Sequence, residues 1–138
     1  MARGYQTDDR TSKRMSAISP KGTKPEKIVR QILTRLGYRY RLHRHDLPGR
    51  PDIVFLGRRK VIFVHGCYWH RHSGCYRATM PARNVELWQE KFDRTVERDQ
   101  NNFQTLQDEG WQLLVIWECE IPEQECIAQR LTQFLEEA

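Results

Sequence analysis

Metal-binding and aromatic side chains are concentrated in residues 64–75. The segment reads VHGCYWHRHSGC and holds two cysteines, three histidines and two large aromatic residues. Thiolates and imidazoles at this density are typical of zinc sites. A histidine that the zinc does not need would be held rigidly beside it, where it could take or give a proton during catalysis. The segment therefore predicts a zinc site next to an acid–base histidine.

Four side chains are the candidate zinc ligands: Cys67, His72, Cys75 and Cys119. A Cys₃His set would fill all four positions of a tetrahedron, which is typical of structural zinc. Spacing alone equally permits His70 in place of His72. The alternative, that the cysteines are reduced thiols in a core, suits Cys126 but not Cys75, which has polar neighbours.

Asp52 opens an apolar segment that is predicted to be a strand. Two apolar runs, 52–56 and 60–64, flank a three-residue turn and indicate a β-hairpin. A regular register about this turn pairs Asp52 with Val64, beside His65. One carboxylate, one backbone carbonyl and several waters are common ligands of Mg²⁺ in phosphate chemistry. We therefore expect Mg²⁺ on Asp52 and the Val64 carbonyl; the alternative is that Asp52 only caps its own turn.

Two further carboxylates have competing explanations. Helical spacing places Asp99 on the buried side of a helix, where it needs a partner. That partner is either a histidine near the end of the sheet or a nearby arginine. Glu26 ends the sequence Thr23-Lys24-Pro25-Glu26, a capping box that explains it without chemistry. Alternatively, the helix N-terminus presents this carboxylate to a cluster of waters.

Hydrophobic periodicity indicates the elements that must position these residues. We expect helices at 24–36, 84–108 and 122–135, and strands at 38–42, 52–56, 60–64 and 111–117. This order predicts an α/β protein with a mixed central sheet flanked by helices. Residues 111–117 are apolar at nearly every position, so we expect a central strand covered on both faces. Leu87 and Cys126 are expected on the buried sides of their helices.

Charge and composition bound the class of protein. The chain has 138 residues, 38% of them hydrophobic, and a net charge of +5. Residues 1–22 are basic and almost free of large apolar side chains, so we expect an arm that lies along an anionic polymer, or else a disordered solubilising tail. Residues 23–138 form the folded domain. The sequence has no apolar run of membrane-spanning length and no apolar core of a signal peptide. We therefore expect reduced cysteines and a cytoplasmic location.

Several short motifs together resemble the very short patch repair (Vsr) endonuclease family. They occur in order at 13–18, 23–26, 49–52, 65–70, 96–99, 110–111 and 117–119. The resemblance spans nearly the whole chain. It implies a restriction-endonuclease-like fold with a zinc-braced loop. It also implies a strand-specific, Mg²⁺-dependent endonuclease that nicks DNA 5′ to the thymine of a T:G mismatch left by deamination of 5-methylcytosine.

The resemblance also implies a role for each candidate residue. Asp52 and the Val64 carbonyl would hold Mg²⁺, and His70 would activate water. Supporting catalytic roles would fall to Glu26, His65 and Asp99. Structural zinc would be held by Cys67, His72, Cys75 and Cys119. DNA would be contacted by an intercalating wedge of Tyr68, Trp69 and Trp88, by Met15 and Ile18 of the arm in the minor groove, and by Lys91 in the major groove.

The expected partner is double-stranded DNA with a T:G mismatch, bound by a monomer associated with the nucleoid, with mismatch-repair proteins as further candidates. The chain departs from the family pattern at Ser73-Gly74, which adds a residue to the zinc loop, and at Thr95, where an asparagine is common. Two rival functions stay open. One is a restriction-like or structure-specific nuclease of the same fold, and the other is a zinc-stabilised DNA-binding module without activity.

Overall fold

The computed structural model describes residues 23–137, so the predicted arm with Met15 and Ile18 lies outside the described residues. The elements follow the predicted order: α2 (Lys24–Arg35), β1 (Arg41–Leu42), β2 (Ile53–Phe55), β3 (Lys60–His65), α3 (Val85–Asp108), β4 (Gln112–Trp117), the 3₁₀ helix η1 (Glu118–Glu120) and α4 (Gln124–Glu136). The expectation of a mixed α/β protein is therefore confirmed. Among the described residues no helix is long and apolar enough to cross a membrane.

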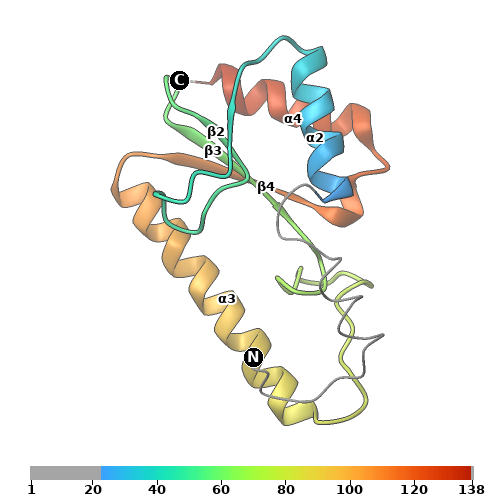
Figure 1. The fold of residues 1–138 in the computed structure, drawn as a ribbon. Coiled ribbons are helices and arrows are strands. Elements are labelled where there is room, and N and C mark those ends of the chain that lie inside the picture. The colour runs from blue at the N-terminus through green and yellow to red at the C-terminus, as the bar shows by residue number, and fades with distance from the viewer. Residues whose placement is uncertain (1–22, 138) are drawn as a thin grey trace.

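The sheet lies between two helical layers (Figure 1). Its strand order is β1-β2-β3-β4, with β3 and β4 parallel and the other pairs antiparallel. On one face, α2 and α4 pack on the sheet and bury a core that includes Val29, Ile62 and Leu131. On the other face, the C-terminal end of α3 contributes Leu106 to a second core with Phe63. The N-terminal half of α3 runs out beyond the sheet.

Strand β4 corrects one expectation. It is an edge strand of the described sheet, not a central one, and within it only Ile116 is fully buried. Its apolar sequence arises because helices cover both faces of the sheet at this edge. Such covering produces the same sequence pattern in an edge strand as in a central strand.

The β2–β3 hairpin corrects a second expectation. Ile53 pairs with Ile62 and Phe55 with Lys60, which shifts the register by one residue from the predicted one. The turn has four residues, 56–59, because the amide of Arg59 donates to the carbonyl of Leu56 and Arg59 adopts a positive φ of 53°. The prediction that strand register pairs Asp52 with Val64 is therefore wrong.

Three smaller expectations are also corrected. Strand β1 contains only Arg41–Leu42, because Tyr38 and Tyr40 pack edge-on against Phe55 instead of pairing. Leu87 is 55% exposed, since it lies on the part of α3 that extends beyond the sheet. Cys126 is exposed because α4 buries the adjacent face, which carries Ile127, Leu131 and Leu135.

Candidate functional site

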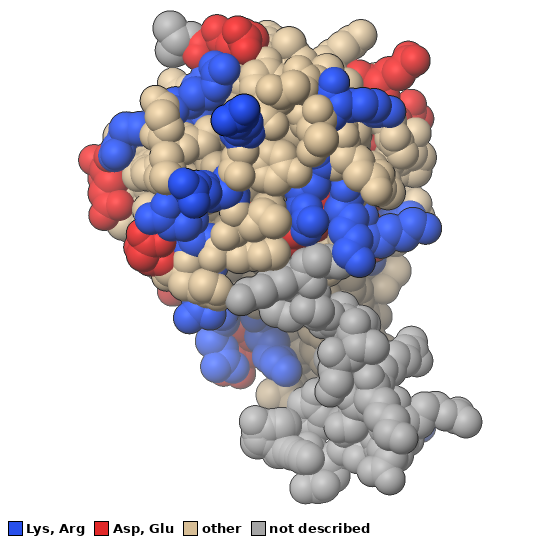
Figure 2. Space-filling model, turned by 45° about the horizontal axis from the view of Figure 1, so that its top comes forward, with Lys and Arg blue, Asp and Glu red and all other residues tan. Residues whose placement is uncertain are grey.

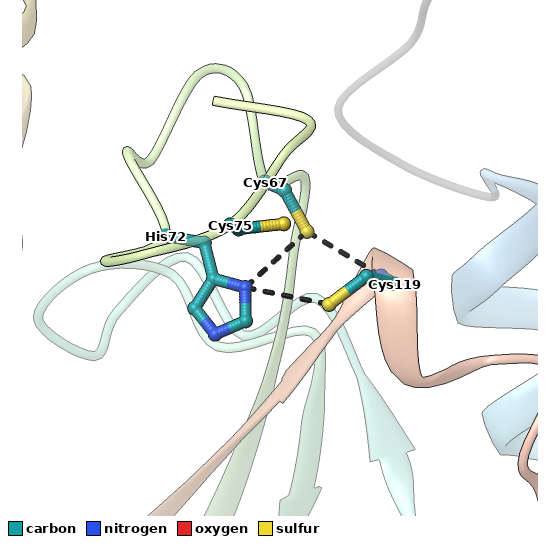
Figure 3. Close-up of side chains that lie close together, drawn as sticks. All are labelled: Cys67, His72, Cys75 and Cys119. Atoms are coloured by element: carbon teal, nitrogen blue, oxygen red, sulfur yellow. Dashed lines mark hydrogen bonds between the residues drawn. The ribbon is translucent and has the colours of Figure 1, made fainter. Parts of the chain in front are cut away.

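The parallel pairing of β3 and β4 brings the candidate zinc ligands together. His65 lies beside Trp117 at the ends of the two strands, so Cys67 and Cys119 follow at the same edge of the sheet. The loop after β3 then folds back, with the amide of His72 donating to the carbonyl of Cys67 (3.0 Å). As a result the ligand atoms of Cys67, His72, Cys75 and Cys119 all lie within 4.8 Å of one another (Figure 3).

The geometry of this cluster fits a tetrahedral ion. His72 Nδ1 lies 3.6 Å from Cys67 Sγ and 3.4 Å from Cys119 Sγ. Ligands at ordinary Zn–S and Zn–N bond lengths would stand about 3.6 Å apart at the corners of a tetrahedron. The His72 ring is further held by Trp117, which stacks on it at 4.2 Å. Three thiols and one imidazole are a donor set that suits zinc, and His72 occupies the position that spacing alone left open between His70 and His72.

Burial raises the pKa of the Cys67 thiol to about 12. A buried thiol of this kind stays protonated at neutral pH unless a cation replaces the proton. Cys67 would therefore lose its proton only when a cation binds, whereas the backbone N–H of Arg77 lowers the pKa of the Cys75 thiol. This observation supports a metal ion without identifying it.

His70 lies in a second cluster, on the α3 side of the same loop. Its Nδ1 donates to Asp99 Oδ2 at 2.7 Å, so the predicted carboxylate–histidine pair is present and the alternative arginine partner for Asp99 is not needed. A carboxylate on Nδ1 leaves the lone pair on Nε2, the atom that could accept a proton. The His70 side chain is 28% exposed, so part of the ring faces solvent.

His65 packs against this pair. Its ring stacks on the His70 ring at a centroid distance of 3.7 Å and is buried at 5% exposure. Burial, together with the neighbouring positive charge of His70, lowers the pKa of His65 to about 3. His65 is therefore neutral at physiological pH and presents a flat surface that fixes the plane of the His70 ring.

Asp52 and Glu26 form a third cluster, joined by His43. Asp52 Oδ2 accepts the amide N–H of Val64 at 2.7 Å, so Asp52 does meet Val64, but through the amide. The predicted use of the Val64 carbonyl stays a prediction. Glu26 is 1% exposed, and its Oε2 lies 2.8 Å from His43 Nε2. The ligand atoms of Glu26, His43 and Asp52 all lie within 4.8 Å of one another.

The electrostatics of Asp52 suit a cation. Burial, opposed by the Val64 amide and reinforced by the charge of Glu26, raises the pKa of Asp52 to about 7. Two neighbouring buried carboxylates are difficult to ionise together unless a cation compensates them. An electrostatic interaction with His70 acts in the other direction and lowers the pKa of Asp52. Carboxylate oxygens are donors that fit Mg²⁺.

Glu26 combines a helix cap with contacts of its carboxylate. The Thr23 hydroxyl accepts the Glu26 amide N–H at 3.4 Å, as a helix cap requires. The carboxylate itself contacts Arg30 (3.3 Å) and His43 (2.8 Å). The cap therefore leaves the carboxylate beside His43 and Asp52, and its catalytic role stays a prediction.

The predicted wedge residues form a layer of rings on α3 and the loop. Trp69 lies 6.2 Å from Trp88, and Tyr68 packs edge-on against Trp69 at 5.0 Å. All three are only partly buried. Lys91, on the same side of α3, places its Nζ 5.1 Å from the centre of the Trp88 ring. These four predicted DNA-contacting residues therefore share one surface.

Two residues in these clusters were missed by sequence analysis. His43 lies between the predicted strands 38–42 and 52–56, and the one available signal is its position nine residues before Asp52. Arg71 stacks over Phe92 at 3.9 Å and donates to the carbonyls of Tyr68, Ala78 and Thr79. It joins the aromatic layer to the zinc loop, and no sequence pattern distinguishes such an arginine from a surface one.

Comparison with known proteins identifies the family of the chain. The family model for DNA mismatch endonuclease Vsr matches residues 4–77. A type II nicking enzyme of Xanthomonas oryzae is 45% identical over 122 residues, covering 88% of this chain and 89% of that protein. The DNA mismatch endonuclease Vsr of Escherichia coli is 43% identical over 127 residues, covering 91% and 81% of the two chains. The chain belongs to the Vsr family of DNA mismatch endonucleases, as its motifs predicted.

Proposed function

We propose that the protein nicks one strand of double-stranded DNA, 5′ to the thymine of a T:G mismatch. The observation that carries this proposal is the His70–Asp99 pair, stacked on a neutral His65. A histidine oriented by a carboxylate is a general base, and a DNA-binding module has no use for one. The relatives named as nicking and mismatch enzymes point to the same reaction.

In this mechanism His70 Nε2 accepts a proton from the attacking water. The water oxygen bonds to phosphorus, the bond to the 3′ oxygen breaks, and that oxygen leaves as an alkoxide that takes a proton from a solvent water to become a 3′ hydroxyl. Asp99 holds Nδ1 of His70 and stabilises the imidazolium that forms. His65, which stays neutral, keeps the ring in its plane.

Asp52, with Glu26 nearby, would hold Mg²⁺, and the Val64 carbonyl is a further proposed ligand. When bound, Mg²⁺ supplies positive charge that stabilises the charge developing on the phosphate. The cluster of Cys67, His72, Cys75 and Cys119 would hold zinc as a closed, structural site. This site fixes the loop that carries His70 and Trp69.

Selection of a mismatch would come from the aromatic layer. Tyr68, Trp69 and Trp88 would insert beside the faulty pair, where unstacking costs less than in matched duplex. Residues 1–22 would act as the basic arm, with Met15 and Ile18 over the minor groove and Lys91 on the major-groove side. Figure 2 shows Lys and Arg side chains in several groups on one face of the molecule, which suits contact with a polyanion.

The test compares duplexes of one sequence that differ only at the mismatched position. We expect Mg²⁺-dependent nicking of the thymine strand of the T:G duplex and none of the matched duplex. The Asp52→Ala variant should bind the T:G duplex but not nick it. Equal cleavage of the matched duplex would favour the restriction-like alternative, and binding without product in any divalent metal would favour the non-catalytic module. Undiminished cleavage by Asp52→Ala would refute the assignment of Asp52.

A further inference from the structure

His43 belongs to the cluster of Glu26, His43 and Asp52 and makes a hydrogen bond to each of the other two residues. Its ring nitrogen Nε2 is 2.8 Å from Glu26 Oε2. Its backbone N–H donates to the carbonyl oxygen of Asp52 at 3.1 Å, which extends the β1–β2 ladder by one bond. One residue therefore connects the N-terminal turn of α2 to the start of β2.

Glu26 needs such a partner because its side chain is almost completely buried, at 1% exposure. A buried carboxylate must accept hydrogen bonds or be paired with charge. Arg30, one turn along α2, contacts the same oxygen at 3.3 Å, but its side chain is 30% exposed. The His43 contact is shorter, and His43 is 20% exposed. Of these two contacts to Oε2, the one from His43 is the shorter and the less exposed.

The backbone at His43 agrees with a held position. His43 has a φ of +50°, in the left-handed region that residues with side chains seldom adopt. Such conformations persist where surrounding contacts determine them and are frequent in functional sites. Here the bonds to Asp52 and Glu26 provide those contacts.

We propose that His43 is a positioning residue of the nuclease site, whose Nε2–H bond to Glu26 holds that carboxylate toward Asp52. The inference rests on the proposed function. Without the donor, the buried Glu26 carboxylate would lose the shorter of its two Oε2 contacts, and with it the hydrogen bond that keeps it near Asp52, since the ligand atoms of the three residues lie within 4.8 Å of one another. Side chains that orient the ligands of a metal site typically contribute a factor of about 10–100 in metal affinity or activity.

The activity test uses two substitutions at His43 and two matched ones at His45, an exposed histidine of the same loop. His43→Gln keeps an N–H donor near the position of Nε2, and His43→Leu removes it. We expect His43→Leu to lower the single-turnover nicking rate, or to raise the half-saturating Mg²⁺ concentration, about 10- to 100-fold. His43→Gln and both His45 variants should stay within about threefold of the wild-type protein, and affinity for the T:G duplex should be unchanged in all four.

A second test needs neither activity nor magnesium. Long-range ¹H–¹⁵N spectra of the histidine rings should show a proton on Nε2 of His43 in the magnesium-free wild-type protein, and this resonance should move in Glu26→Gln. An unprotonated Nε2, or a resonance that Glu26→Gln leaves in place, would overturn the proposal. So would full activity in His43→Leu, or an equal loss in His43→Gln and His43→Leu. If the wild-type protein nicks no duplex, the proposed function fails, while the spectra still decide the role of His43.

Discussion

Replacing Asp99 by asparagine tests the proposed general base. The His70 Nδ1–Asp99 Oδ2 hydrogen bond is short, at 2.7 Å, and joins a ring N–H to a carboxylate. A charge-assisted bond of this type contributes about 1.5–3 kcal/mol, which corresponds to about 10- to 150-fold in rate if it is lost in the transition state. The amide of asparagine can also donate to Nδ1, which favours the tautomer with a proton on Nε2. His70 would then be unable to accept a proton from water. We therefore expect a loss of about 10²- to 10⁴-fold, the range that general-base catalysis supplies.

The assay is the single-turnover nicking rate of the T:G duplex at saturating protein and Mg²⁺. Asp93→Asn provides a matched control, because Asp93 is an exposed residue of the same helix that accepts a hydrogen bond from Gln89 (2.8 Å). Affinity for the duplex should be the same in both variants. A rate within threefold of wild type for Asp99→Asn, or an equal loss in Asp93→Asn, would refute the role of the His70–Asp99 pair.

Three further predictions follow from the other clusters. Cys119→Ser should remove bound zinc and lower Tm by roughly 10 °C or more. The control Cys126→Ser, at an exposed site, should change Tm by less than about 2 °C. Equal Tm values for the two variants would contradict the zinc assignment. Because the pKa of Asp52 is raised to about 7, the folded, magnesium-free protein keeps a proton there that the unfolded chain has already lost. Its free energy of unfolding should therefore fall between about pH 4 and pH 7, by roughly 4 kcal/mol from this group, and Asp52→Asn should lack that fall when urea unfolding is followed across the range. Trp69→Ala should weaken T:G duplex binding about 5- to 150-fold, and Tyr76→Ala, which changes a 76% exposed ring, by less than about threefold; the same Kd for both variants would count against the wedge.

The residues of the zinc cluster could be predicted because their chemistry is concentrated in a short segment. Cys67, His72 and Cys75 are close in sequence, and Cys119 follows the strand that pairs with β3. Spacing alone did not distinguish His72 from His70, and the family resemblance implied His72. The structure distinguishes them by placing His70 against Asp99 on α3.

The hairpin shows where sequence patterns are insufficient. An apolar run on each side of a Gly-Arg-Arg segment predicts a hairpin but not the number of residues in its turn. That number depends on the hydrogen bond across 56–59 and on the positive φ of Arg59. The contact of Asp52 with Val64 nevertheless occurs, because the carboxylate reaches past its strand partner to the amide.

The edge position of β4 and the contacts of His43 could not be predicted from the sequence, for a different reason. Both depend on contacts between segments that are distant in sequence or separated by an irregular loop. An apolar strand has the same pattern at the edge of a covered sheet as at its centre. A histidine in a loop has no periodicity that relates it to Glu26, 17 residues earlier.

A structure of the protein with Ca²⁺ in place of Mg²⁺, bound to an uncleaved T:G duplex, tests the central claim most directly. We expect His70 Nε2 and the Asp52 carboxylate to approach the same phosphate, the one 5′ to the mispaired thymine. We also expect Trp69 to be inserted beside the T:G pair. Finding His70 and Asp52 at different phosphates, or the scissile phosphate bound outside both clusters, would contradict it.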